Sequence, residues 1–185
     1  PLSALRPFAD EPWAALLLSD GSPGATRSFL FRRPTRTLVL TRTEDGVQAL
    51  RDFLAEATGT VLGLAAYEFG AGLEGLDLPR DGRWPDLVLA DYPQWLTFDH
   101  ATGQILATGD ATSWLEARRN DPGAVSEGAL EPVAPPERYE AAVADVVRRI
   151  GEGELFQANI AQAWSGQLGS GDTPLAVFER LGGAS

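Results

Sequence analysis

The 185-residue chain contains no cysteine and no lysine, and its single histidine is His100. The absence of cysteine excludes a disulfide framework, a thiolate nucleophile and any cysteine-based zinc or iron–sulfur site. The absence of lysine excludes an amine nucleophile or a Schiff base on a side chain of this stretch. A metal site would have to rest on carboxylates, and the acidic residues show no spacing typical of a metal-binding loop.

Positive charge and long apolar runs are also scarce. Fifteen basic residues stand against 26 acidic ones, which gives a formal net charge of -11. Such a chain repels phosphate backbones and anionic lipids, so nucleic acid and membrane surfaces are not expected as partners. Apolar runs such as 14–18 and 61–66 are too short to span a bilayer, and the first residues lack a signal-peptide hydrophobic region. We therefore expect a soluble, cytoplasmic protein.

What the chain does have is enough apolar and aromatic material for a core. Hydrophobic residues make up 44% of the sequence, with five Trp, eight Phe and three Tyr. A chain of this length can bury a sizeable core and is too short for two large independent domains. One domain, or one incomplete domain, is the expectation.

The first part of the sequence alternates short apolar runs with turn residues, a pattern typical of strands. It predicts strands over 14–18, 28–31 and 36–40, followed by an amphipathic helix over 44–57 with apolar residues at helical spacing. The apolar segment 61–69 indicates a buried strand or strand pair that runs into a flexible loop at Gly70-Ala71-Gly72.

The middle of the sequence predicts a hairpin. Residues 87–99 and 104–108 favour strands, and 100–103 supply the turn between them. The sheet should therefore be mostly antiparallel, and the fold class is α+β. A short helix over 112–119 and a connecting loop over 120–136 follow.

The last part carries the clearest helix, from Glu137 to about Gly151, with apolar residues on one face and charges largely opposite. The segment 154–164 then alternates apolar residues with amides, which suggests a strand with one polar face. A final helix should begin with Thr173 as its N-cap and Pro174 at its first position.

Few residues suggest chemistry. Gln157, Asn159 and Gln162 stand in an apolar context, where an unpaired amide costs about 1–3 kcal/mol, so they either line a ligand site or fasten backbone. His100 follows Asp99 at the predicted hairpin tip, which indicates a solvated turn residue without a role.

Two further patterns have an ordinary explanation. Arg32 and Arg33 could meet an anion, but neighbouring side chains on a strand point to opposite faces, so a solvated edge is favoured. The glycines after Tyr67-Glu68 do not continue into a phosphate-binding pattern and are interpreted as turn residues.

The segment from Glu137 to Gln162 resembles a hallmark of chorismate-utilising enzymes. In that family a Tyr-led helix ends in a Gly-Asp/Glu turn before Phe/Tyr-Gln-x-Asn-Leu-x-Gln; here Tyr139 lies on the helix, Gly151-Glu152 forms the turn, and Phe156-Gln157-Ala158-Asn159-Ile160-Ala161-Gln162 follows. The upstream runs 12–19, 28–30, 63–70 and 85–87 resemble the family's amino-terminal domain in the same order. The resemblance covers essentially the whole chain.

This resemblance implies a mostly antiparallel β-sandwich with flanking helices. It implies an amino-terminal domain of the anthranilate/aminodeoxychorismate synthase component I type over 1–132, and a truncated start of the chorismate-binding domain over 133–185. It also implies an effector pocket of the kind that binds tryptophan in the family. By motif position, the candidate pocket residues are Ser19, Ser28, Phe29, Gln157 and Asn159.

Within the family, Asn159 favours aminodeoxychorismate synthase component I, because anthranilate synthase component I usually has Gln-Val-Val-x-Ser at 157–161. This branch implies amination of chorismate to 4-amino-4-deoxychorismate for para-aminobenzoate and folate biosynthesis, with ammonia supplied by a glutamine amidotransferase partner. The resemblance also implies magnesium held by glutamates of the carboxyl-terminal half. Those motifs fall beyond the equivalent of Ser185, so we expect no catalytic and no metal-binding residue here, and an inactive fragment.

Two alternatives stay open. The nearest is anthranilate synthase component I of tryptophan biosynthesis. The other is a free-standing amino-acid-binding regulatory module, which is disfavoured because the last helix would leave apolar surface and strand edges uncovered.

Overall fold

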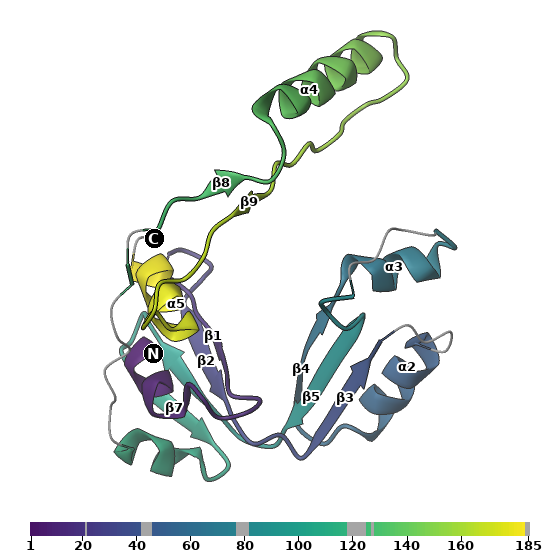
Figure 1. The fold of residues 1–185 in the computed structure, drawn as a ribbon. Coiled ribbons are helices and arrows are strands. Elements are labelled where there is room, and N and C mark those ends of the chain that lie inside the picture. The colour runs from purple at the N-terminus through teal and green to yellow at the C-terminus, as the bar shows by residue number, and fades with distance from the viewer. Residues whose placement is uncertain (21, 42–45, 77–81, 118–124, 127, 184–185) are drawn as a thin grey trace. The chain divides into compact units, whose positions relative to one another are not determined.

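The computed structural model describes the chain except residues 21, 42–45, 77–81, 118–124, 127 and 184–185 (Figure 1). The chain divides into two compact units, residues 1–121 with 182–185 and residues 122–181. The sequence-based domain boundary at residue 132 concerns family domains and stays a prediction.

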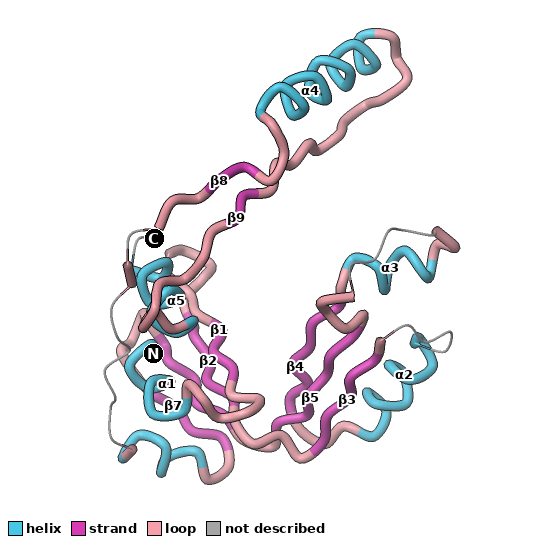
Figure 2. The backbone as a smooth tube through the Cα atoms, in the orientation of Figure 1, coloured by secondary structure: helices cyan, strands magenta, loops and turns pink. Residues whose placement is uncertain are grey.

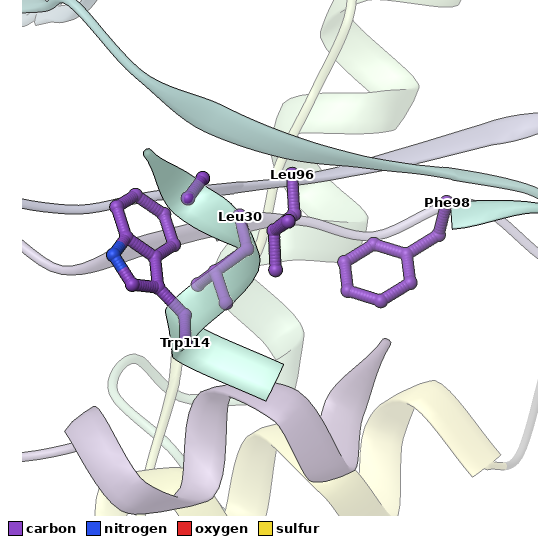
Figure 3. Close-up of a cluster of buried hydrophobic side chains, with 5 residues drawn as sticks. Leu30, Leu96, Phe98 and Trp114 are labelled. Carbon is purple, nitrogen blue, oxygen red and sulfur yellow. The ribbon is translucent and has the colours of Figure 1, made fainter. Parts of the chain in front are cut away.

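The first unit contains a four-stranded antiparallel sheet in the order β1-β2-β6-β7. Its strands are β1 (Ala15–Leu17), β2 (Arg27–Phe31), β6 (Trp95–Asp99) and β7 (Ile105–Thr108). Because side chains alternate across a strand, Leu30, Leu96 and Phe98 share one face, where they pack with Trp114 (Figure 3). The 3₁₀ helix η2 (Ala111–Glu116) supplies Trp114, and the helical segments α1 (Leu2–Leu5) and η1 (Arg6–Phe8) add half-buried apolar residues.

A second antiparallel sheet in the same unit has the order β3-β5-β4. It contains β3 (Arg36–Leu40), β4 (Thr60–Ala65) and β5 (Leu87–Tyr92), and helix α2 (Gly46–Glu56) packs on one face (Figure 2). Phe53 of α2 is buried against Leu87 and Leu89, as the apolar spacing of the helix predicts. The predicted strands over 14–18, 28–31 and 36–40 and the helix after them are confirmed.

Two continuous stretches of chain connect the sheets. Strand β2 leads into β3, and β5 leads into β6 across Pro93-Gln94. Aromatic residues pack where these two connections leave the strands. The Phe31 ring centroid lies 5.2 Å from that of Tyr92 and 6.2 Å from that of Trp95. The hydroxyl of Tyr92 donates a hydrogen bond to the carbonyl oxygen of Trp13 at 2.8 Å, so this buried phenol has a partner.

The connection from α2 to β4 is fixed by the buried carboxylate of Asp91. Its Oδ2 accepts the N–H of Thr58 at 2.8 Å, and its Oδ1 accepts the N–H of Gly59 at 2.9 Å. Gly59 passes so close to β5 that a Cβ atom would lie 2.1 Å from the carbonyl oxygen of Tyr92. Only glycine fits at this position.

Arg32 forms a buried charged cluster. Its side chain is 4% exposed, and its guanidinium carbon lies 3.2 Å from the ring centroid of Phe8 and 4.9 Å from that of Trp114. Its Nε donates to Oε2 of Glu11 at 3.1 Å, and its Nη2 pairs with the same oxygen. The Arg33 side chain is 68% exposed, with Nε 3.7 Å from Oε1 of Glu11. The expected solvated edge is therefore wrong for Arg32, because aromatic packing and Glu11 compensate its desolvation.

The segment after β4 also differs from its prediction. The strand ends at Ala65, and helix α3 (Tyr67–Leu73) follows where a flexible loop was expected. Phe69 packs with the Phe53 cluster, while a Cβ atom at Gly70 or Gly72 would meet nothing within 4 Å. The glycines are therefore not loop markers here, because a tertiary contact of Phe69 favours a helical turn.

The second unit contains helix α4 (Pro136–Gly151), a two-residue ladder between β8 (Glu131–Pro132) and β9 (Trp164–Ser165), and helix α5 (Pro174–Gly183), which ends in the first unit. Both predicted helices are confirmed, and Thr173 Oγ1 accepts the N–H of Ala176 at 3.1 Å as an N-cap. Asp172 accepts the N–H of Ser126 at 2.9 Å and that of Gly169 at 2.7 Å. Hydrogen bonds from Ser126 and then Gly169 hold the pKa of Asp172 below its ordinary value.

The strand predicted over 154–164 is wrong for most of its length. The chain after α4 has no ladder partner among the described residues until Trp164, which pairs with Pro132. A strand is stabilised by its neighbours, so alternation alone does not create one. Phe156 in this segment is 96% exposed.

The fold class is α+β, as predicted, with antiparallel sheets and flanking helices. Of the helices that the structure describes, none has the length and apolar character needed to cross a membrane.

Candidate functional site

A cavity of about 480 Å³ lies in the first unit, beside the ends of β1, β2 and β6. It has an apolar part and a polar part. The polar part is formed by Ser19, Asp20 and His100, and the described residues that line the cavity are Pro1, Leu2, Leu18, Ser19, Asp20, Ala25, His100 and Gly182. Ser19 is one of the residues that the family motif placed in an effector pocket, so this cavity is the candidate functional site.

A buried hydroxyl organises the polar part of the cavity. Ser28 on β2 is 0% exposed, and its Oγ accepts the backbone N–H of Ser19 at 3.0 Å. The same Oγ lies 2.8 Å from Nε2 of His100. Two of the five predicted site residues, Ser19 and Ser28, are therefore in direct contact.

Asp20 gives the cavity a fixed negative charge. Its Oδ1 accepts the N–H of Ser22 at 2.9 Å. Hydrogen bonds from Ser22 hold the pKa of the Asp20 carboxyl below its ordinary value. The carboxylate is ionised at neutral pH and can pair with an ammonium group of a ligand.

The expectation that His100 is a solvated turn residue without a role is wrong. His100 is half-buried, lines the cavity and contacts Ser28. Its backbone N–H donates to the carbonyl oxygen of Thr26 at 2.8 Å, which extends the β2–β6 pairing by one residue. The alternation of Leu96, Phe98 and His100 was the signal in the sequence, because these residues share one face of a strand.

Phe29 lies on the opposite face of β2 from Ser28. Its ring centroid is 6.2 Å from that of Phe31, and both belong to the cluster where the two sheets connect. The residues that line the cavity do not include Phe29.

Gln157 and Asn159 belong to the second unit, where both are exposed on the segment between α4 and β9. Gln162 fastens backbone instead, since its Nε2 donates to the carbonyl oxygen of Ala134 at 3.2 Å. The five-residue effector site of Ser19, Ser28, Phe29, Gln157 and Asn159 stays a prediction.

The acidic residues offer no ligand set for magnesium in the part of the chain that the structure describes. No three His, Asp or Glu side chains within it cluster closely enough to hold a metal ion. The resemblance assigns magnesium to glutamates of the carboxyl-terminal half, which stays a prediction, and no chemical step through magnesium follows from the described residues.

The model of the chorismate binding enzyme family matches residues 15–185. Among solved structures, the chain is similar to the crystal structure of anthranilate synthase component I from Streptococcus pneumoniae TIGR4, with a TM-score of 0.64 and 20% sequence identity. That match covers 89% of this chain and 46% of the solved chain, so this chain spans about half the length of its neighbour. At this identity the likeness shows the fold alone. No curated protein matches the chain.

Proposed function

The chain belongs to the family of chorismate binding enzymes, and from that premise we propose that it is part of an aminodeoxychorismate synthase component I. The observation that carries the choice of branch is Asn159, within Gln157-Ala158-Asn159-Ile160-Ala161. By the resemblance, an asparagine at this motif position is typical of the enzymes that make 4-amino-4-deoxychorismate. The rival branch, anthranilate synthase component I, is the one represented by the similar solved structure.

The proposed reaction replaces a hydroxyl group of chorismate by an amino group. A C–N bond forms between ammonia and the ring, the C–O bond of the hydroxyl breaks, and water leaves with acid assistance. A glutamine amidotransferase partner supplies the ammonia, and magnesium, held outside the residues described here, supplies a Lewis acid. The described residues form the folded amino-terminal part of the proposed enzyme and the cavity beside Ser19.

We predict that the 185-residue chain by itself makes no aminated product. Incubation with chorismate, ammonia and magnesium should leave chorismate unchanged, because the proposal places the catalytic and metal-binding groups outside this chain. Chromatography of the mixture measures this, and the full-length protein that carries the chain is the positive control. Product formed by the pure chain would contradict the assignment of catalysis to other residues.

We also propose that the cavity binds an amino acid such as tryptophan as an effector. Asp20 provides an anionic partner for the ligand's ammonium group, and Ser19 provides a polar contact beside it. The apolar lining, which includes Leu2 and Leu18, receives the side chain. This observation also favours the alternative of an amino-acid-binding regulatory module.

Titration calorimetry with tryptophan tests the effector proposal. We expect saturable heat with the intact chain and an affinity lower by on the order of tenfold in Asp20→Asn, since one charge-assisted hydrogen bond is lost. Asp110→Asn, at an exposed position that does not line the cavity, is the matched control and should bind normally. The absence of heat with the unaltered chain would remove tryptophan as the effector.

A further inference from the structure

The hydroxyl of Ser28 holds the end of β1 in place. Its oxygen accepts the N–H of Ser19. Among the described residues, the partner found for the hydroxyl proton of Ser28 is His100. Since Ser28 is fully buried, water does not replace a missing partner. The orientation of this one hydroxyl therefore depends on His100.

The state of the imidazole decides which way the hydroxyl proton points. A neutral ring with its proton on Nδ1 accepts the Ser28 O–H at Nε2, while the Ser28 oxygen accepts the Ser19 N–H; both groups are then satisfied. We assign this tautomer because it leaves no buried group unpaired. A protonated ring must instead donate from Nε2 to the Ser28 oxygen, which leaves the buried hydroxyl proton without an acceptor.

Three elements next to this pair carry charged groups. Asp20, in the β1–β2 connection, lines the same cavity as His100. Asp99 precedes His100 on β6 and is held by Thr102, whose N–H donates to its Oδ1 at 2.9 Å. Arg27 on β2 pairs with the other carboxylate oxygen of Asp99 at 3.4 Å.

We propose that His100 is a positioning residue of this cavity, which orients the buried Ser28 hydroxyl and thereby holds the backbone of Ser19, and that protonation of His100 loosens that hold. The polar part of the cavity then responds to pH. The identity of the ligand rests on the proposed effector function. The hydrogen-bond relay from His100 through Ser28 to Ser19 does not, because it is a property of the fold.

Nuclear magnetic resonance of the intact chain tests the relay without a ligand. Because His100 is the single histidine, its imidazole signals identify the titration without ambiguity. We expect the Ser19 amide signal to shift with pH along the same curve as the imidazole. We also expect hydrogen exchange of the Ser19 amide to be on the order of tenfold faster in Ser28→Ala and in His100→Ala, because one hydrogen bond is lost or weakened.

Two further variants separate positioning from general stability. His100→Gln offers Ser28 an acceptor that does not titrate, so it should restore slow exchange at Ser19 and abolish its pH dependence. Thr102→Ala alters the same turn away from the cavity and should leave Ser19 unchanged. A Ser19 signal that ignores the imidazole titration, or His100→Gln with the pH response of the unaltered chain, would refute the proposal. Neither result depends on whether tryptophan binds.

Discussion

Replacement of Gly59 by alanine should lower the free energy of unfolding of the first unit by about 3 kcal/mol, in the upper part of the range for overpacked sites. The new Cβ atom would lie 2.1 Å from the carbonyl oxygen of Tyr92 and 2.5 Å from its carbonyl carbon. Both atoms are backbone, so no side-chain rotation relieves the clash. Separation of the strands would also break the hydrogen bond from the Gly59 N–H to Asp91.

Urea denaturation followed by tryptophan fluorescence measures this effect, since Trp95 and Trp114 lie in the first unit. Gly70→Ala is the matched control, because its Cβ atom meets nothing within 4 Å and the residue lies in α3. Alanine is favoured over glycine in a helix by roughly 1 kcal/mol, so this variant should be as stable as the parent or more stable. Equal destabilisation by both changes would contradict the close approach at Gly59.

Replacement of Arg32 by methionine should cost about 3 kcal/mol of unfolding free energy. Removal of one member of a buried ion pair typically costs 3–5 kcal/mol, and the lower end applies because Glu11 keeps some exposure. The change leaves the Glu11 carboxylate without the Nε and Nη2 donors of Arg32. It also removes the guanidinium from the ring of Phe8.

Arg33→Met provides the comparison within the same cluster. Arg33 faces the same glutamate but is mostly exposed and 3.7 Å away, so its loss should cost at most about 1 kcal/mol. Both variants remove one positive charge next to Glu11. The difference between their free energies of unfolding, measured by the same denaturation, therefore reports the effect of burial. Similar losses for both would show that Arg32 does not act as a buried anchor.

The elements that were predicted correctly from sequence are those with a local cause. Strands β1, β2 and β3 are short apolar runs between turn residues, and α2 and α4 carry apolar residues at helical spacing. Thr173 and Pro174 mark the start of α5 through capping chemistry that involves only neighbouring residues. Such features require no knowledge of the rest of the fold.

The elements that were missed depend on distant partners. Helix α3 forms where Phe69 reaches the Phe53 cluster, and Arg32 is buried because Phe8, Glu11 and Trp114 surround it. The segment after α4 alternates like a strand but lacks a neighbouring strand among the described residues until Trp164. Local pattern carries no information about such partners.

The effector site itself stays a prediction. The family motif grouped Ser19 with Ser28, and a hydrogen bond of 3.0 Å joins these two residues. It also grouped Phe29 with Ser28, although adjacent residues of a strand face opposite sides. The structure places the Phe29 ring in the cluster of Phe31. The role of His100 was missed because a residue at a hairpin tip is usually exposed to solvent. Its alternation with Leu96 and Phe98, however, places it on the same sheet face as Ser28.

The position of the new nitrogen in the product tests the central claim most directly. The full-length protein would be supplied with chorismate and ¹⁵N-labelled ammonia, and the product examined by nuclear magnetic resonance. The account predicts nitrogen para to the ring carboxylate, at the carbon that carried the hydroxyl, with the enolpyruvyl group retained. Nitrogen ortho to the carboxylate, with pyruvate released, would identify anthranilate and contradict the assignment drawn from Asn159.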